Sequence, residues 1–215
     1  MRRLPLFPLG LVLFPGMPLQ LQVFEPRYVQ MLEDLAEREP EEREFGVTAI
    51  REGSEVGRGR VTSVHTVGCT ARLASVRHLG DRYAVRALGT WRFRLDGVDV
   101  AATTPYATGL VTRMPELRGD EALAAERAAQ VRRSLEAYAT ALNGAIPPLP
   151  ADPDELAYTV GALVPLPILD QQAVLAAPTT ADRLAVVRDC LRQEAKLIRA
   201  TRSLPFRRST TLSPN

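Results

Sequence analysis

Residues 4–28, LPLFPLGLVLFPGMPLQLQVFEPRY, decide how the chain begins to fold. The stretch is apolar and interrupted by prolines, and in residues 19–23 leucine or valine alternates with glutamine. Such alternation is typical of a strand with one buried and one solvated face. Pro26 suits the first position of a helix, and apolar residues then recur at three- and four-residue spacing as far as Ala36. The stretch therefore predicts a strand, a turn, a second strand and a helix.

The same opening has the outline of a secretory signal, because Arg2 and Arg3 precede an apolar run. Pro5 and Pro8 would break a signal helix near its start, and no small-x-small cleavage site follows. We therefore interpret the opening as part of the fold rather than as a targeting segment.

A hairpin is predicted in the middle of the chain. A Gly-Asp pair at 80–81 stands between alternating segments, which is typical of a hairpin with a two-residue loop. Folding back about this loop sets Val76 opposite Val85 and, in the same register, Ala74 opposite Ala87.

Further strands are predicted around this hairpin, at 45–50, 91–95 and 106–113, with a turn at 96–97. In the second of these, aromatic or apolar side chains share one face and arginines the other, the two sets being Trp91, Phe93 and Leu95, and Arg92 and Arg94. Short strands with short connections are typical of an antiparallel sandwich or barrel.

The pattern becomes helical after residue 119. Asp120 is placed to cap a helix that ends near Gly144, and its apolar residues step by three and four. Asp152 followed by Pro153 predicts the start of a second helix. A short helix then ends near residue 176, and a final helix begins at 179 or 180.

The run at 4–28, closed by Phe-Glu-Pro-Arg-Tyr, resembles the opening of the Lon protease N-terminal domain, in the version found in bacterial proteins that consist of this domain alone. The segment at 89–95, GTWRFRL, adds to the resemblance. The resemblance implies an α+β fold, with an N-terminal PUA-like β-barrel followed by a C-terminal helical subdomain. We expect the barrel in residues 1–115, the helical bundle in 116–205 and a flexible tail in 206–215.

Composition is that of an ordinary globular protein. Of 215 residues 46% are hydrophobic and 24% are charged, and the net charge of +2 leaves no strong basic excess for nucleic acid or anionic lipid. No apolar run reaches the roughly 18 residues that a membrane-spanning helix needs, so no membrane partner is expected. Cys69 and Cys190 are too few and too distant to suggest a disulfide framework, which favours a reducing, cytoplasmic location.

Sequence motifs for catalysis are missing. The single lysine, Lys196, follows Ala195 in a predicted helix, so neither the Gly-Lys-Ser/Thr loop of an ATPase nor the Ser-Lys dyad of a Lon peptidase is present. His65 and Cys69 fall on one strand face, but two ligands do not make a zinc site, and His78 has no cysteine pair nearby. We therefore expect no catalytic residue, no metal and no cofactor.

Binding chemistry remains. Large apolar groups near turns are candidates for contact with a protein or peptide, with core packing as the alternative for each of them: Phe7, Phe14, Met17, Phe24 and Trp91. A second set belongs to the motifs and is interpreted as structural, with Arg27 pairing with Glu25 or another carboxylate at the helix entry: Glu25, Arg27, Tyr28, Arg92 and Phe93.

Two hypotheses follow. The first is a non-catalytic module that binds unfolded or partner protein segments, as the resemblance implies, acting alone or as an adaptor for a separate protease, and existing as a monomer or weak dimer. The second is an RNA-binding module of PUA-like fold, which would use an arginine-bearing sheet face: Arg72, Arg86, Arg92 and Arg94. An enzyme of unknown type is the third and weakest reading.

Overall fold

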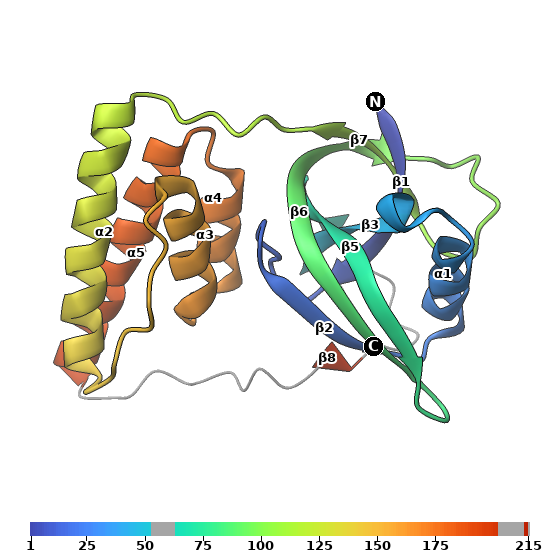
Figure 1. Cartoon of the computed structure of the whole chain (residues 1–215), viewed down its shortest axis with the longest axis horizontal. Coiled ribbons are helices and arrows are strands. Elements are labelled where there is room, and N and C mark those ends of the chain that lie inside the picture. The colour runs from blue at the N-terminus through green and yellow to red at the C-terminus, as the bar shows by residue number, and fades with distance from the viewer. Residues whose placement is uncertain (53–62, 202–212, 215) are drawn as a thin grey trace. The chain divides into compact units, whose positions relative to one another are not determined.

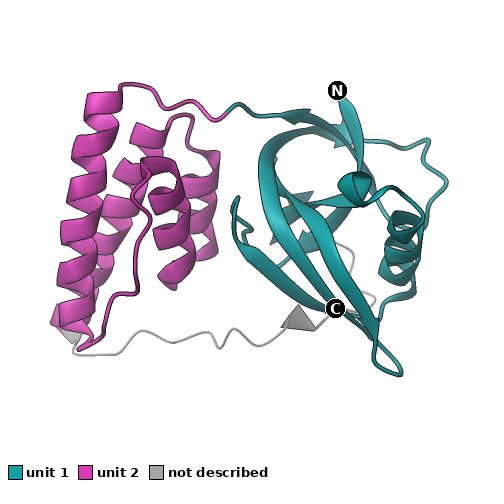
Figure 2. Ribbon diagram, viewed as in Figure 1, with its two compact units in different colours: residues 1–115, 210–215 teal, residues 116–209 magenta. Residues whose placement is uncertain are grey.

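The computed structural model describes residues 1–52, 63–201 and 213–214. The chain divides into two compact units, residues 1–115 with 210–215, and residues 116–209 (Figure 2). Of the predicted tail, 206–215, all but Ser213–Pro214 lies outside the described residues.

The first unit holds the strands and one α-helix. In chain order its elements are β1 (Arg2–Leu9), β2 (Pro18–Val23), α1 (Pro26–Ala36), the short 3-10 helix η1 (Pro40–Glu42), β3 (Glu44–Glu52), β4 (Ser63–Val64), β5 (Val67–His78), β6 (Tyr83–Val98), β7 (Thr108–Arg113) and β8 (Ser213–Pro214) (Figure 1). The predicted order of strand, turn, strand and helix at the start of the chain is confirmed.

Five of these strands close into a barrel. Going round it, β1 pairs with β3, β3 with β5, β5 with β6, β6 with β7, and β7 with β1. The β1–β3 pair is parallel and the other four are antiparallel, so the barrel departs from the expected all-antiparallel pattern at this pair. β1 changes neighbour at its middle, pairing with β7 through residues 2–5 and with β3 through residues 6–9.

Phe93 fills the barrel interior. Its side chain is fully buried and packs with a cluster of core residues: Leu4, Leu6 and Val111, with Trp91 and Leu95 partly buried against them. The Phe93 ring packs directly against Gly68 of the barrel wall. A Cβ atom at residue 68 would lie 2.4 Å from the Cζ atom of Phe93. A side chain at that position would collide with the ring.

A second core lies between the strands and α1. The inner face of β2 is buried through Leu19, Leu21 and Val23, as the alternation predicted. α1 buries Tyr28, Met31, Leu32 and Leu35, and Pro26 is its first residue. The helix exists because its apolar residues recur every three or four positions and so lie on one face.

The predicted strand pairing of the hairpin is correct near the loop, but it is shifted by one residue further from the loop. Gly80 has the positive φ of +73° that the first loop position requires, and Val76 pairs with Val85. Ala87, however, pairs with Leu73, because a β-bulge between Leu73 and Ser75 takes up one residue. The pairing of Ala74 with Ala87 was therefore wrong.

The turn predicted at 96–97 was also wrong. β6 continues to Val98, and its ladder with β7 shifts register between Leu95 and Gly97. Asp96 and Gly97 thus form a bulge within a strand, a position in which glycine is also common.

The second unit is helical, with α2 (Glu121–Ala141), α3 (Pro153–Leu163), α4 (Ile168–Ala176) and α5 (Thr180–Thr201). The predicted caps are present: the Asp120 carboxylate accepts from the backbone N–H of Leu123 at 3.0 Å, and Asp152 accepts from that of Asp154 at 2.8 Å. At the end of α2 it is Asn143 that takes the left-handed φ of 51°, and the Gly144 N–H donates to the carbonyl of Ala139.

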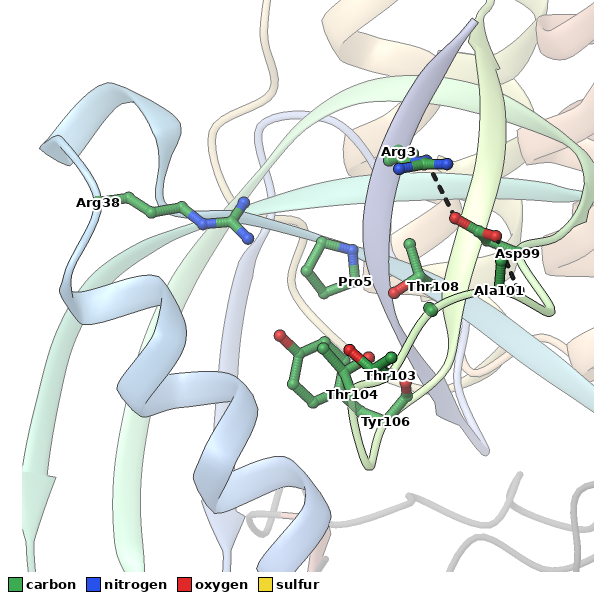
Figure 3. Close-up of a pocket in the computed structure, with 10 residues that line it drawn as sticks. Arg3, Pro5, Arg38, Asp99, Ala101, Thr103, Thr104, Tyr106 and Thr108 are labelled. Atoms are coloured by element: carbon green, nitrogen blue, oxygen red, sulfur yellow. Dashed lines mark hydrogen bonds and ion pairs between the residues drawn. The ribbon is translucent and has the colours of Figure 1, made fainter.

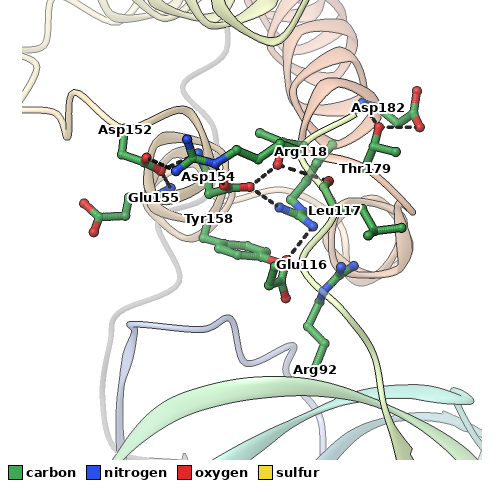
Figure 4. A network of polar contacts seen from close by, with 12 residues as sticks. Arg92, Glu116, Leu117, Arg118, Asp152, Asp154, Glu155, Tyr158, Thr179 and Asp182 are labelled. Carbon is green, nitrogen blue, oxygen red and sulfur yellow. Dashed lines mark hydrogen bonds and ion pairs between the residues drawn. The ribbon is translucent and has the colours of Figure 1, made fainter. Parts of the chain in front are cut away.

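A buried arginine holds this unit together. Arg183 of α5 has no exposed side-chain surface, and it pairs with Glu116 at 2.9 Å and with Asp154 at 3.3 Å (Figure 4). The Tyr158 ring lies 4.3 Å from the guanidinium carbon, and its hydroxyl also donates to Glu116 at 2.8 Å. Buried charges need such partners, so the network fixes the segment before α2 to α3 and α5.

Candidate functional site

Two of the five apolar candidates belong to the core. Phe7 and Phe14 are buried, and the Phe7 ring stacks on that of Tyr28 with ring centroids 4.1 Å apart. The backbone at Phe14 also approaches β6 closely, because a Cβ at Gly89 would lie 2.2 Å from the Phe14 carbonyl oxygen. Neither side chain offers surface to a partner, so the packing alternative holds for both.

The other three candidates have surface. Phe24 is 41% exposed just after β2, whereas half-buried Met17 precedes the same strand at its other end. The Met17 carbonyl accepts from the N–H of Gly89 at 2.9 Å, two residues before half-buried Trp91, whose ring centroid lies 5.8 Å from the guanidinium carbon of Arg2. Phe24 therefore does not share one site with Met17.

The Glu-Pro-Arg-Tyr motif is a local structure at the entry to α1. The expected pair of Arg27 and Glu25 is present at 2.8 Å, and the Arg27 guanidinium lies over the Tyr28 ring, 4.6 Å from its centroid. Tyr28 in turn stacks on Phe7 of β1. These contacts tie the start of the helix to the barrel.

The arginine face proposed for RNA is not formed as expected. Arg92 is fully buried and donates to the Pro115 carbonyl at 3.2 Å, because the segment after β7 passes over it. Arg94 pairs with Asp96 at 2.7 Å. Alternation places Arg92 and Phe93 on opposite faces of the strand, so the sequence predicted that only one of them is buried. In the structure both are fully buried.

A different arginine surface lies on the arm, by which we mean β2 with the residues of β5 and β6 beside it, 72–78 and 83–88. Its inner face is buried, and its outer face carries two exposed arginines: Arg86, which belongs to the predicted arginine face, and Arg77, which the structure adds. Figure 1 shows the β5–β6 hairpin extending to its tip beyond the barrel ring. The hairpin register that pairs Val76 with Val85 puts both arginines on one face, because Arg77 then lies opposite Ala84 and Arg86 opposite Ser75.

A pocket of about 330 Å³ lies at another place on the first unit (Figure 3). Arg3 of β1 and Arg38, just after α1, lie on opposite sides of it, and Arg3 pairs with Asp99 at 3.0 Å. Its remaining lining residues come mainly from the loop before β7: Pro5, Ala101, Ala102, Thr103, Thr104, Tyr106 and Thr108. Sequence analysis missed this pocket, because no motif marks residues that only the barrel ring brings together.

The Tyr106 hydroxyl beside this pocket donates to Asp34 of α1 at 2.5 Å. Burial, and then the bond to this carboxylate, raises the pKa of Tyr106 to about 12. The bonds from Tyr106 and then Gln30 lower the pKa of Asp34 below its usual 3.8. Both shifts favour a carboxylate that accepts from a neutral phenol, which links α1 to the loop before β7.

Metal ligands, cysteine thiols and apolar helices are the remaining features of the described residues that could indicate a function. In this part of the chain no group of three or more His, Cys, Asp or Glu side chains is arranged to hold a metal ion. Cys69 and Cys190 are free thiols, and burial raises the pKa of Cys190 to about 11, away from the range of a reactive thiolate. No helix within residues 1–52 and 63–201 is long and apolar enough to cross a membrane.

Two solved structures share the fold. The Lon N-terminal domain protein from Xanthomonas campestris matches with a TM-score of 0.61 and 24% identity, covering 86% of this chain and 96% of that one. The N-terminal domain of Mycobacterium avium complex Lon protease matches with a TM-score of 0.64 and 18% identity, covering 88% and 98%. The predicted α+β class, with strands followed by helices, is confirmed by this likeness.

Sequence comparison gives the family. Lon protease 1 of Herpetosiphon aurantiacus is 26% identical over 204 residues, which span 88% of this chain but only 24% of the length of that protease. The family model of the ATP-dependent protease La (LON) substrate-binding domain matches residues 3–193. The chain therefore belongs to the LON substrate-binding domain family.

Proposed function

We propose that this chain binds unfolded or extended segments of other proteins and catalyses no reaction itself. The observation that carries the proposal is the match of residues 3–193 to a substrate-binding domain. The substrate of a protease is a polypeptide, so the ligand of such a domain is a protein segment.

Exposed apolar side chains on the first unit support the proposal. Large apolar side chains are solvent-exposed just after β2 and along the β5–β6 hairpin: Phe24, Val76, Leu79 and Leu88. Unfolded chains expose apolar side chains of their own, and contact between the two removes both from water. Met17 and Trp91 have less surface to contribute.

We also propose how the domain serves proteolysis. The chain covers about a quarter of its relative's length, 24%, and would act as an adaptor that delivers bound segments to a separate protease. As a monomer or weak dimer, it would leave its binding surface open to the ligand. Sedimentation velocity across a range of concentrations tests the oligomeric state.

Hydrogen exchange of the full chain, with and without a reduced, unfolded model protein, tests the binding. We expect protection in the first unit, around residues 17–24 and 76–88. Phe24→Asp should weaken binding about tenfold, because it puts a charge where apolar surface was buried. The matched control is Leu169→Asp in α4, which charges a side chain that is 72% exposed on the other unit.

Protection in neither unit, with the protein folded, would contradict the proposed function. Equal loss of binding in the Phe24→Asp and Leu169→Asp variants would contradict its placement on the first unit.

A further inference from the structure

We infer that the outer face of the arm binds an acidic, extended protein segment that adds to the edge of β2. This inference rests on the proposed function and names the chemistry of one class of ligand. The site lies on the arm that also carries exposed Val76 and Leu88, but recognition there depends on charge and backbone pairing as well as apolar contact.

Strand register places the arginines. On the outer face Ser75 lies opposite Arg86, and Arg77 lies opposite Ala84, so the two arginines are diagonal neighbours on adjacent strands. Diagonal neighbours in an antiparallel pair lie about 7–8 Å apart at the backbone. The two guanidinium groups thus concentrate positive charge on this face. Arg86, on β6, lies one strand nearer to the outer edge of β2 than Arg77, on β5.

The two charges are uncompensated. Within the described residues neither Arg77 nor Arg86 has a carboxylate at ion-pair distance, whereas Arg72 pairs with Glu44 at 3.0 Å and Arg82 with Asp81 at 2.9 Å. Arg82 also donates to Gln22 of β2 at 3.1 Å. Like charges held near one another repel, and a ligand carboxylate beside Arg86 offsets that repulsion.

The edge of β2 supplies the second half of the site. One edge of β2 pairs with β6, and among the described residues the other edge pairs, in parallel, only with β8, through Leu21 and Gln22. That outer edge therefore accepts an extended segment, and a ligand strand would replace β8 and continue toward Pro18. An added strand would lie about 4.8 Å from β2 and about twice that from β6, within reach of an arginine side chain on β6.

The ligand chemistry follows from the two faces of such a strand. Acidic residues at every second position would meet the outer face, which carries Gln20 beside Arg86 and, at its barrel end, Pro18 beside exposed Leu88. The intervening residues would face the apolar side of β2 and should be valine-like. RNA would use the arginines but could not pair with the strand edge, so backbone pairing separates the two ligand classes.

A labelled peptide of alternating valine and glutamate, titrated with the full chain and followed by fluorescence anisotropy, tests the inference. We expect binding that weakens as salt rises, and no binding of the valine–lysine peptide. The double variant Arg77→Glu with Arg86→Glu should weaken binding at least about tenfold, because attraction becomes repulsion. The matched control, Arg133→Glu with Arg192→Glu, makes the same charge change on the exposed surfaces of α2 and α5.

Backbone methylation of the peptide tests strand addition without altering the protein. In an added strand alternate N–H groups face β2, so methylating the valines and methylating the glutamates should differ, one peptide binding and the other not. Equal binding of both methylated peptides, or equal loss in the two arginine double variants, would overturn the inference. So would a structured RNA that binds while the glutamate peptide does not.

The proposed function and this inference can be contradicted independently of each other. If the unfolded model protein binds and the glutamate peptide does not, protein binding stands and the acidic specificity is wrong. If the glutamate peptide binds by these criteria and the unfolded protein does not, the arm site stands and general recognition of unfolded chains is wrong.

Discussion

The two halves of β6 have similar sequences and opposite surroundings. In the barrel half, Phe93 and Arg92 are both fully buried. In the arm half, Val85 and Ala87 are buried while Arg86 and Leu88 face water, Leu88 being 47% exposed. The outer face of β6 is thus exposed at Arg86 and Leu88, whereas both faces are buried at Arg92 and Phe93.

The difference comes from what covers the second face. Around Phe93 the ring of strands is closed, and the chain after β7 crosses over Arg92, where the Met114 N–H donates to the Arg92 carbonyl at 2.9 Å. In the arm, β6 has β2 and β5 on its two sides and no element over its outer face is seen in the described residues. An arginine is therefore a structural part in the first half and available to a ligand in the second.

Replacing the barrel side chain should give the largest effect. Phe93→Ala removes a ring enclosed by the barrel and should lower the free energy of unfolding by about 3–5 kcal/mol. Urea denaturation followed by far-UV circular dichroism measures this. Leu88→Ala, on the same strand, should stay within about 0.5 kcal/mol of the unaltered protein. Similar losses in both would mean that the two halves are not as different as their burial indicates.

The same contrast can be made on α5. Arg183→Ala leaves Glu116 and Asp154 without their shared cation, and because these carboxylates are partly exposed we expect a loss of about 3 kcal/mol, the low end for a broken buried pair. Arg188→Ala removes an arginine paired with Asp189 at the surface and should cost less than about 1 kcal/mol. Thermal unfolding of both variants compares them. An Arg183→Ala protein as stable as Arg188→Ala would show that the buried network contributes little.

A smaller effect is expected at the link between α1 and the loop before β7. Tyr106→Phe removes the hydrogen bond to Asp34 and should cost about 1 kcal/mol at neutral pH. Tyr83→Phe, on the arm half of β6, is the control and should cost less, since no described residue accepts from its hydroxyl.

The pH dependence of this loss has a fixed sign. The lowered pKa of Asp34 means that its contribution is present above 3.8 and is lost as pH falls through the lower folded value. The raised pKa of Tyr106 means that its contribution is present below 10.0 and is lost as pH rises through about 12. The difference between Tyr106→Phe and the unaltered protein should therefore be constant from about pH 5 to 9 and shrink on either side. A difference that grows toward acid pH would contradict the assignment.

The features that could be predicted from the sequence are those set by residues close together in the chain. Helix caps, such as Asp120 and Asp152, act within three residues, and strand alternation or a glycine at a hairpin loop is equally short in range. The start of α1 at Pro26, the buried stripes of the helices and the hairpin loop at 80–81 were therefore predictable, as was the resemblance carried by residues 4–28.

The features that could not be predicted are which side chains are buried on both faces of a strand and which distant segments lie together. Alternation separates the faces of a strand but does not say whether the second face is covered. The sequence therefore left core packing and binding open for Phe7 and Phe14, and a structural role and RNA contact open for Arg92, and all three are buried. The parallel β1–β3 pair and the pocket beside Tyr106 depend on contacts between distant segments. Ring closure creates these features, because it fixes which distant residues meet.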